Sequence, residues 1–255
     1  MSASGTVKSS VENGIATITF FHPQSNSLPG ELLRSLATEI INQGMNDEAQ
    51  VIVLRSEGEK AFCAGASFDE LMSISSFDEG RNFFSGFAMV INAMRKAPKF
   101  IISRVQGKAV GGGVGIAAAS DYAIASVYAD VKLSELAVGI GPFVVGPAVE
   151  RKMGKSAFSS LAINATEWKT AEWARENGLY AEVHPDLVSV DAAVLRLAQK
   201  LAASSPAAMR ELKEIFWKGT GDWDTLLIER ADVSGTLVLS DYTRNAIAGF
   251  KQGAR

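Results

Sequence analysis

Two glycine- and alanine-rich segments are the part of this sequence with the clearest chemical potential. They read FCAGAS at residues 62–67 and GKAVGGGVGIAAAS at residues 107–120, and each follows a short β-branched run, at 51–54 and 100–105. Small residues let the backbone approach another group closely, and an amide at the start of a helix gains from the helix dipole. Two such N–H groups directed at one oxygen would stabilise a negative charge that develops on it. Taken alone, however, the glycine run favours close packing of a helix on a strand.

The elements that must position these loops form an α/β pattern followed by helices. Asn13-Gly14 between two β-rich runs predicts a tight hairpin, because both residues tolerate positive φ angles. Ser27 is a candidate cap for a helix that includes Pro29 in its first turn. The expected strands are 7–10, 15–20, 51–54, 100–105, 122–125 and 131–133. The expected helices are 32–44, 77–96, 156–164, 171–177, 191–204, 206–218 and 223–239, with only helices after residue 155.

Composition restricts the partners of the protein. The 255 residues are 47% hydrophobic, enough for a substantial core, and the formal net charge of -3 leaves no basic surplus for nucleic acid or an anionic membrane. Cys63 is the one cysteine, so no internal disulfide is possible, and no acidic or histidine cluster predicts a metal site. The first residues lack a secretory signal, and the longest uncharged stretch, 136–149, is too short to span a bilayer. A cytoplasmic location is therefore expected.

Four stretches, in their order and spacing, resemble the crotonase (enoyl-CoA hydratase/isomerase) superfamily. They are KAFCAGASFDEL at 60–71, VQGKAVGGGVGIAAASDYAIAS at 105–126, LSELAVGIGP at 133–142 and KTAEWARENGLYAEVHP at 169–185. The resemblance implies an α/β fold, a spiral of repeated ββα units with a helical C-terminal lobe. It also implies a core over residues 1–195 and an oligomerisation lobe over 196–255 that forms a homotrimer or hexamer.

The resemblance assigns roles to individual residues. The backbone N–H groups of Ala66 and Gly112 correspond to the two donors that hold the thioester oxygen of an acyl-CoA substrate. Substrate-binding positions carried over in the same way are Ala64, Ser67, Phe68, Gly111, Phe250 and Lys251. Coenzyme A arrives as part of the substrate, so no separate cofactor is expected.

Glu135 is the expected catalytic acid and base. Hydratases of the superfamily carry two glutamates, and the positions that match them here are Gly115 and Glu135, so one carboxylate is missing. A single carboxylate suits proton transfer between two carbons, as in the single-glutamate Δ3,Δ2-enoyl-CoA isomerases of the superfamily. The segment GPFVVGP at 141–147 is apolar, as in isomerases, and such a lining would exclude water.

Three alternatives remain open from the sequence. The first is an enoyl-CoA hydratase or 3-hydroxyacyl-CoA dehydratase of fatty-acid or branched-chain degradation. The second is a non-catalytic acyl-CoA-binding or RNA-associated relative. The third is a nucleotide oxidoreductase, because residues 113–118 satisfy a G-x-G-x-x-A pattern, although the segment before Glu135 is too interrupted for the required helix and strand. Structural rather than catalytic roles are expected for His22, His184, Cys63, Asp69 and Glu70.

Overall fold

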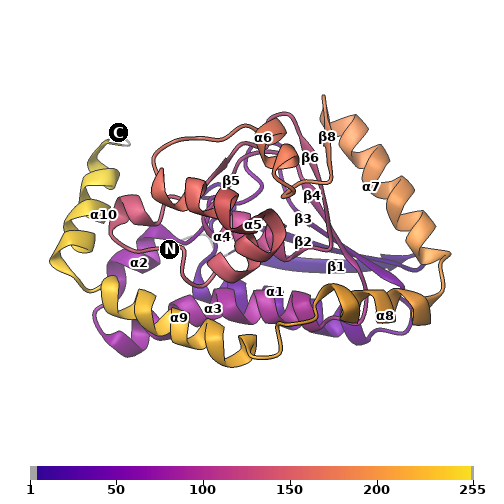
Figure 1. Cartoon of the computed structure of the whole chain (residues 1–255), viewed down its shortest axis with the longest axis horizontal. Helices are drawn as coiled ribbons and strands as arrows, with labels where there is room; N and C mark the ends of the chain where they lie inside the picture. Colours follow the sequence, from indigo (N-terminus) through magenta and orange to yellow (C-terminus); the bar gives the residue numbers. More distant parts are fainter. Residues whose placement is uncertain (1–4, 254–255) are drawn as a thin grey trace.

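The structure is a computed structural model that describes residues 5–253, with side chains described for residues 5–249. A six-stranded sheet in the order β1-β2-β3-β4-β6-β8 forms its centre (Figure 1). Its strands are β1 (Thr6–Glu12), β2 (Ile15–Phe21), β3 (Val51–Ser56), β4 (Ile101–Val105), β6 (Tyr122–Ser126) and β8 (Glu182–His184). The first pair is antiparallel and the others are parallel. The predicted hairpin is confirmed, with φ of 51° at Asn13 and 77° at Gly14.

Helices cover both faces of the sheet, which explains why its middle strands are hydrophobic on both sides. Along β3, Ile52 and Leu54 belong to the core cluster beneath α1 (Gly30–Met45) and α3 (Phe77–Lys96). Val51 and Val53 point the other way, into a second cluster with α7 (Leu187–Ala202). This alternation follows from the two-residue period of a strand. The large sheet thus forms a rigid layer from which the intervening loops emerge.

A second, two-stranded sheet holds those loops together. It pairs β5 (Ala109–Val110) with β7 (Val131–Lys132) in parallel. An isolated parallel bridge joins Cys63 to Ala109, so the first glycine-rich loop lies beside the second. This small sheet is the element that brings residues 62–67, 109–112 and 131–135 to one place.

The remaining helices surround the two sheets (Figure 1). They are α2 (Phe68–Ser73), α4 (Gly112–Ala119), a 3₁₀ turn (Leu136–Val138), α5 (Gly146–Ile163), α6 (Ala171–Glu176), α8 (Pro206–Phe216), α9 (Trp223–Leu237) and α10 (Asp241–Gly253). Helices α2 and α10 lie at the left of the view and α8 at the right (Figure 1). Helix α9 packs along α3 at a glycine pair: a Cβ placed on Gly80 would lie 2.9 Å from the Gly235 Cα. The absence of side chains at both positions lets the two backbones touch, and the C-terminal region is thereby drawn against the core.

The α/β class predicted from the sequence is confirmed, with several local corrections. Strand β8 lies in the region where only helices were expected; its three residues are half-buried at the sheet edge and carry no strong pattern. Helix α5 begins at Gly146 instead of residue 156, and α10 is a separate helix that was not predicted. Ser27 does not cap α1; the Gly30 N–H donates to the Glu70 carboxylate at 2.7 Å.

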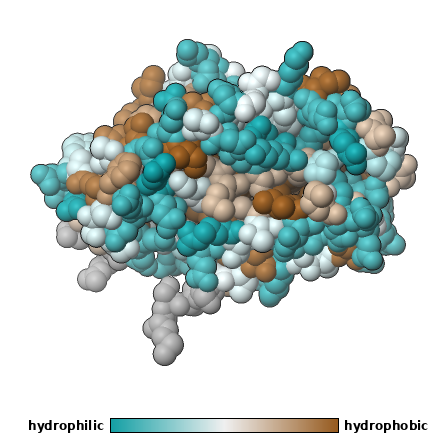
Figure 2. Space-filling view, turned by 90° about the horizontal axis from the view of Figure 1, so that it is seen from below, coloured by the Kyte–Doolittle hydropathy of each residue, from teal (hydrophilic) through white to brown (hydrophobic). Residues whose placement is uncertain are grey.

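The boundary expected after residue 195 falls inside α7, and self-association through residues 196–255 stays a prediction. Viewed from below, the surface is mostly hydrophilic, with hydrophobic residues near the middle of the face (Figure 2). Large apolar side chains exposed on the helices at the bottom of Figure 1 include Ile41 and Met89. None of the helices between residues 5 and 253 is long and apolar enough to cross a membrane.

Candidate active site

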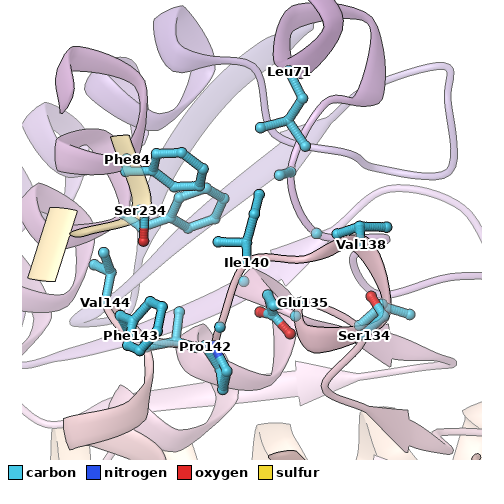
Figure 3. Close-up of a pocket in the computed structure, with 18 of the residues that line it drawn as sticks. Leu71, Phe84, Ser134, Glu135, Val138, Ile140, Pro142, Phe143, Val144 and Ser234 are labelled. Atoms are coloured by element: carbon cyan, nitrogen blue, oxygen red, sulfur yellow. The ribbon is translucent and has the colours of Figure 1, made fainter. Parts of the chain in front are cut away.

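A pocket of about 600 Å³, counting its open mouth, lies where the glycine-rich loops meet. Its walls come from both loops, from the turn after β7 and from helices α2, α3 and α9 (Figure 3). The lining residues are Ala64, Gly65, Ala66, Phe68, Leu71, Phe84, Phe87, Val110, Gly111, Gly112, Ser134, Glu135, Val138, Ile140, Gly141, Pro142, Phe143, Val144, Val145 and Ser234. The wall is predominantly apolar with a few polar groups, as expected of a small-molecule site.

The first loop requires glycine at position 65. Gly65 has φ of 86°, and a Cβ there would lie 2.9 Å from the Val110 carbonyl oxygen. Its own carbonyl accepts from the Leu28 N–H at 2.8 Å. The next residue, Ala66, lines the pocket, and its backbone N–H takes no part in the hydrogen bond between Leu28 and Gly65.

The second loop leads into α4 through an unusual backbone conformation. Gly111 has φ of 52°, and Gly112 then begins the helix, so the Gly112 N–H has no acceptor one turn earlier. A Cβ on Gly112 would lie 2.1 Å from the Phe87 ring, which excludes every other residue type without rearrangement.

The two loops approach each other at these donors. The site of a Cβ on Gly65 lies 3.6 Å from the Gly112 nitrogen. Within residues 5–249, neither the Ala66 N–H nor the Gly112 N–H has a hydrogen-bond partner. Because unpaired backbone donors are uncommon in folded proteins, two of them in one pocket wall indicate an acceptor supplied from outside the chain. A carbonyl oxygen that gains negative charge has the chemistry to fill that position.

Asn26 secures the outer side of the first loop. It is buried, adopts φ of 56°, and donates from its side-chain amide to the carbonyls of Glu57 and Ala61, both at 2.9 Å. Its side-chain oxygen accepts from the His22 N–H at 3.0 Å. The residue before it, Ser25, accepts from the Ala64 N–H at 3.1 Å. Asn26 thus connects the turn at 22–28 to both ends of the segment that leads to Ala66.

Glu135 enters the pocket from the turn that follows β7. Its backbone carbonyl accepts from Val138 at 3.2 Å and from Ile140 at 3.0 Å, which fixes the residue at the start of a tight turn. Its carboxylate lies against the second loop: a Cβ on Gly111 would be 2.9 Å from Oε1. The carboxylate points toward the middle of the pocket (Figure 3). Glycine at 111 is therefore needed for the carboxylate to lie against the second loop.

The environment of Glu135 favours its protonated form. Oε2 is buried and is without a partner among the described residues. Burial raises the pKa of Glu135 to about 7, and a hydrogen bond from its own backbone N–H opposes this only in part. Of the described residues that line the pocket, Glu135 is the only one with an ionisable side chain. A carboxyl group with a pKa near 7 can accept and return a proton at neutral pH.

The position matching a second carboxylate is filled by packing. Gly115 is buried on α4, and a Cβ there would lie 2.5 Å from Val145 Cγ1. The predicted apolar segment lines the same side of the pocket through Pro142, Phe143 and Val144 (Figure 3). Val145 therefore takes the space into which a longer side chain at 115 would project.

Three of the six predicted substrate-binding positions lie in the pocket wall. Ala64, Phe68 and Gly111 line it, together with Ala66, Gly112 and Glu135. Ser67 does not: its hydroxyl caps α2 by accepting from Glu70 N, and its N–H donates to the Leu28 carbonyl. Phe250 and Lys251 fall outside the residues whose side chains are described.

The other chemically reactive side chains are used in structural contacts outside the pocket. Glu70 caps α1, and Asp69 accepts from the Gln24 side chain at 2.7 Å. Nδ1 of His22 lies 3.0 Å from the Ser27 hydroxyl, and His184 lies 2.8 Å from Glu182. Burial raises the pKa of the Cys63 thiol to about 12. In the described part of the chain, His, Cys, Asp and Glu side chains are nowhere grouped in threes that could hold a metal ion.

Sequence reasoning missed three residues of the site. Asn26 lies in a segment whose sequence indicates only turns. The carbonyl groups that its side chain binds belong to Glu57 and Ala61, which are distant in the sequence. Phe87 is one of several buried residues on the amphipathic helix α3, and its sequence context does not distinguish it from the others. Ser234 reaches the wall from α9 through the Gly80–Gly235 contact, which no local pattern indicates.

Most of the chain is similar in sequence to known proteins. Residues 10–233 match the family model described as Enoyl-CoA hydratase/isomerase. YngF of Bacillus subtilis strain 168, which carries the name of an enoyl-CoA hydratase/isomerase, is 30% identical over 94% of this chain and 93% of its own. The short-chain-enoyl-CoA hydratase of Clostridium acetobutylicum is 28% identical, covering 94% and 92%.

Solved structures share the fold. The crystal structure of enoyl-CoA hydratase from Bacillus halodurans matches with a TM-score of 0.87 at 21% identity, covering 95% of this chain and 99% of that one. The chain belongs to the enoyl-CoA hydratase/isomerase family and is an enzyme of the isomerase and lyase kind that this family contains.

Proposed function

We propose that the protein is a Δ3,Δ2-enoyl-CoA isomerase that uses Glu135 as its single acid and base. The observation that carries this proposal is that Glu135 is alone as an ionisable group in the described pocket wall, while Val145 fills the place of a second carboxylate beside Gly115. A shift of a double bond needs one group that removes and returns a proton. Addition of water needs, in addition, a group that holds and polarises the water.

The two backbone donors activate the substrate. The thioester carbonyl oxygen of a 3-enoyl-CoA accepts hydrogen bonds from the N–H groups of Ala66 and Gly112. These bonds strengthen as negative charge moves onto the oxygen, so they stabilise the dienolate more than the bound substrate. Loss of one donor of this kind costs about 3 to 4 kcal/mol of transition-state stabilisation.

Glu135 moves the proton. Its carboxylate removes a proton from C2, and the electron pair of that C–H bond delocalises through the carbonyl to give the dienolate. The carboxyl group then delivers the same proton to C4, while the double bond forms between C2 and C3. The raised pKa of about 7 suits both steps, because the group must be a base for the first and an acid for the second.

Hydration is the second candidate, because a relative 28% identical to this chain is a short-chain-enoyl-CoA hydratase. The two reactions are separated by incubating the protein with 3-enoyl-CoA and 2-enoyl-CoA of equal chain length in water enriched in ¹⁸O. We expect conversion of the 3-enoyl to the 2-enoyl thioester without incorporation of label. If labelled 3-hydroxyacyl-CoA is the main product, the protein is a hydratase and the proposal of isomerisation is wrong.

Glu135→Gln tests the residue assignment. We expect kcat for isomerisation to fall by about 10² to 10⁴-fold, the usual contribution of a general acid–base group, with a smaller change in KM. Glu150→Gln is the matched control, since Glu150 undergoes the same change on the exposed face of α5 and should retain full activity. An unchanged rate in Glu135→Gln would remove Glu135 from the mechanism.

A further inference from the structure

A second cavity adjoins the pocket. It has a volume of about 720 Å³, counting open solvent, and it is lined by residues at the end of α2, in the following turn, after α9 and on α10. Leu71 belongs to the walls of both cavities. In Figure 3, Leu71 lies at the far end of the pocket from Glu135, with Ile140 between them. Because Leu71 is the residue that the two walls share, a ligand that extended past its side chain would reach the second cavity.

The second cavity contains one charged side chain, Arg244, among its described lining residues. Arg244 is exposed. Within residues 5–249 it forms no ion pair with an acidic side chain. The two serines nearby have already used their hydroxyl protons: Ser73 donates to the Glu70 carbonyl and Ser75 to Glu79. The guanidinium is thus the strongest donor left uncommitted in this cavity.

The carboxylates of Glu70 and Glu79 already accept hydrogen bonds from other parts of the chain. The Glu79 carboxylate accepts from the N–H and hydroxyl of Ser75 and from the Ser76 N–H, at the start of α3. The Glu70 carboxylate accepts from Gly30. An anionic group entering beside Arg244 would meet a planar array of donors suited to two carboxylate oxygens.

The route to this cavity is suited to a hydrocarbon chain. Between Glu135 and Leu71 the wall is made of apolar side chains, including Phe84, Val138 and Ile140. The polar pantetheine and nucleotide portion of a CoA thioester would leave its hydrogen-bonding groups unpaired along such a wall, whereas an alkyl chain would not. The acyl chain therefore fits the direction of Leu71, with its far end beside Arg244.

We infer that the acyl group of the substrate ends in an anionic oxygen group, a carboxylate, which Arg244 binds in the cavity beyond Leu71. This inference rests on the proposed function for the direction of the acyl chain. The substrate class is then the ω-carboxyl enoyl-CoA thioesters, with one group bound at each end of the pocket. The Ala66 and Gly112 donors hold the thioester oxygen, and Arg244 holds the other end.

Equilibrium binding tests the inference without requiring turnover. Dissociation constants are measured for adipoyl-CoA and hexanoyl-CoA, saturated thioesters of equal chain length that differ in the terminal carboxylate. We expect the wild-type protein to prefer adipoyl-CoA by about 10- to 100-fold, the range for a hydrogen bond to a charged group. Arg244→Leu should abolish this preference by weakening adipoyl-CoA alone, and Arg244→Lys should restore part of it.

Two results would overturn the inference. Equal affinity of the wild-type protein for the two thioesters would show that no anion is recognised at the chain end. Weaker binding of both thioesters and of free CoA in Arg244→Leu, with an unchanged melting temperature, would assign Arg244 to a CoA phosphate. The outcome is separate from that of the proposed function, because Glu135→Gln can abolish or spare isomerisation without changing the preference between saturated ligands.

Discussion

At the residue scale, the chemistry depends on an unfavourable placement of Glu135. Its Oε2 is buried without a partner among the described residues, and Oε1 lies so close to Gly111 that a Cβ there would be 2.9 Å away. An ordinary surface glutamate would be fully ionised at neutral pH and a poor proton donor. Burial favours the acid form and raises the pKa, and no cation of the described residues is among the causes that act on this group.

This pKa predicts the pH dependence of activity. The first step needs the ionised carboxylate, so kcat/KM for isomerisation should rise with pH through an apparent pKa of about 7 and then level off. The measurement is kcat/KM between about pH 5.5 and 8.5 with a 3-enoyl-CoA. A profile that is flat across this range would show that no group with a raised pKa controls the reaction.

At the scale of elements, the small β5–β7 sheet does more for the site than the large one. Cys63 bridges to Ala109, and the Gly111 N–H donates to the Lys132 carbonyl at 2.9 Å. These contacts connect the two donor loops to the turn that carries Glu135. The outer side of the first loop depends on the turn at 22–28, where Asn26 makes three hydrogen bonds to the backbone.

Asn26→Ala tests that support. Without the amide, the carbonyls of Glu57 and Ala61 lose their donor, and the segment before Ala66 is held less accurately. We expect kcat to fall by about 10- to 100-fold with a smaller change in KM, because a displacement of about 1 Å at a reacting group has effects of this size.

Asn42→Ala, on the exposed side of α1, provides the comparison for Asn26→Ala and should leave kcat unchanged. Assays are made well below the melting temperature of both variants. A loss of stability in Asn26→Ala with normal kcat would limit Asn26 to a role in folding.

The sequence predicts the parts of the site that are local. The two loops are visible because glycine and alanine are required wherever backbones come within contact distance, as at Gly65 and Gly112. The middle strands of the large sheet are visible because β3 and β4 are short, mostly apolar runs that are buried on both faces. Strand β8 was not predicted, because three half-buried edge residues carry too few apolar positions to form a pattern. Helix α10 was not predicted either, although it has 13 residues, because polar and charged residues make up much of it.

Features that depend on tertiary contacts could not be predicted. The spacing that identifies Glu135 does not reveal whether its side chain faces a cavity; this follows from the turn after β7 and from Gly111. Likewise, the absence of a carboxylate at Gly115 is readable, but the filling of its place by Val145 is a property of packing between α4 and the start of α5.

At the scale of the whole molecule, the burial of the Glu135 carboxyl group is expected to make the stability of the fold depend on pH. Glu135 has a higher pKa in the folded protein, about 7, than the value of 4.5 expected when exposed. At pH values between 4.5 and about 7, Glu135 binds a proton in the folded state but not in the unfolded state. The contribution of Glu135 to the free energy of unfolding is therefore fully present below about pH 4.5 and is lost as pH rises through about 7.

Glu135→Gln should remove this dependence. The difference in the free energy of unfolding between the variant and the wild type should be larger at pH 8.5 than at pH 5, in favour of the variant. The increase should be up to about 3 kcal/mol, from the usual conversion of pKa units into energy. Chemical denaturation at both pH values measures the difference. Parallel pH curves for the two proteins would contradict a buried, raised-pKa carboxyl group at this position.

The contact of Gly80 with Gly235 has a consequence for how the enzyme is made. Ser234 is the pocket residue nearest the C-terminus, and it reaches the wall only when α9 lies against α3. A ribosome-bound chain that has already emerged through Glu135 carries the proposed proton-transfer group and both proposed oxygen-binding amides, yet one side of the pocket is still missing. Catalytic competence should therefore arise late in translation, when the helix bearing Ser234 docks.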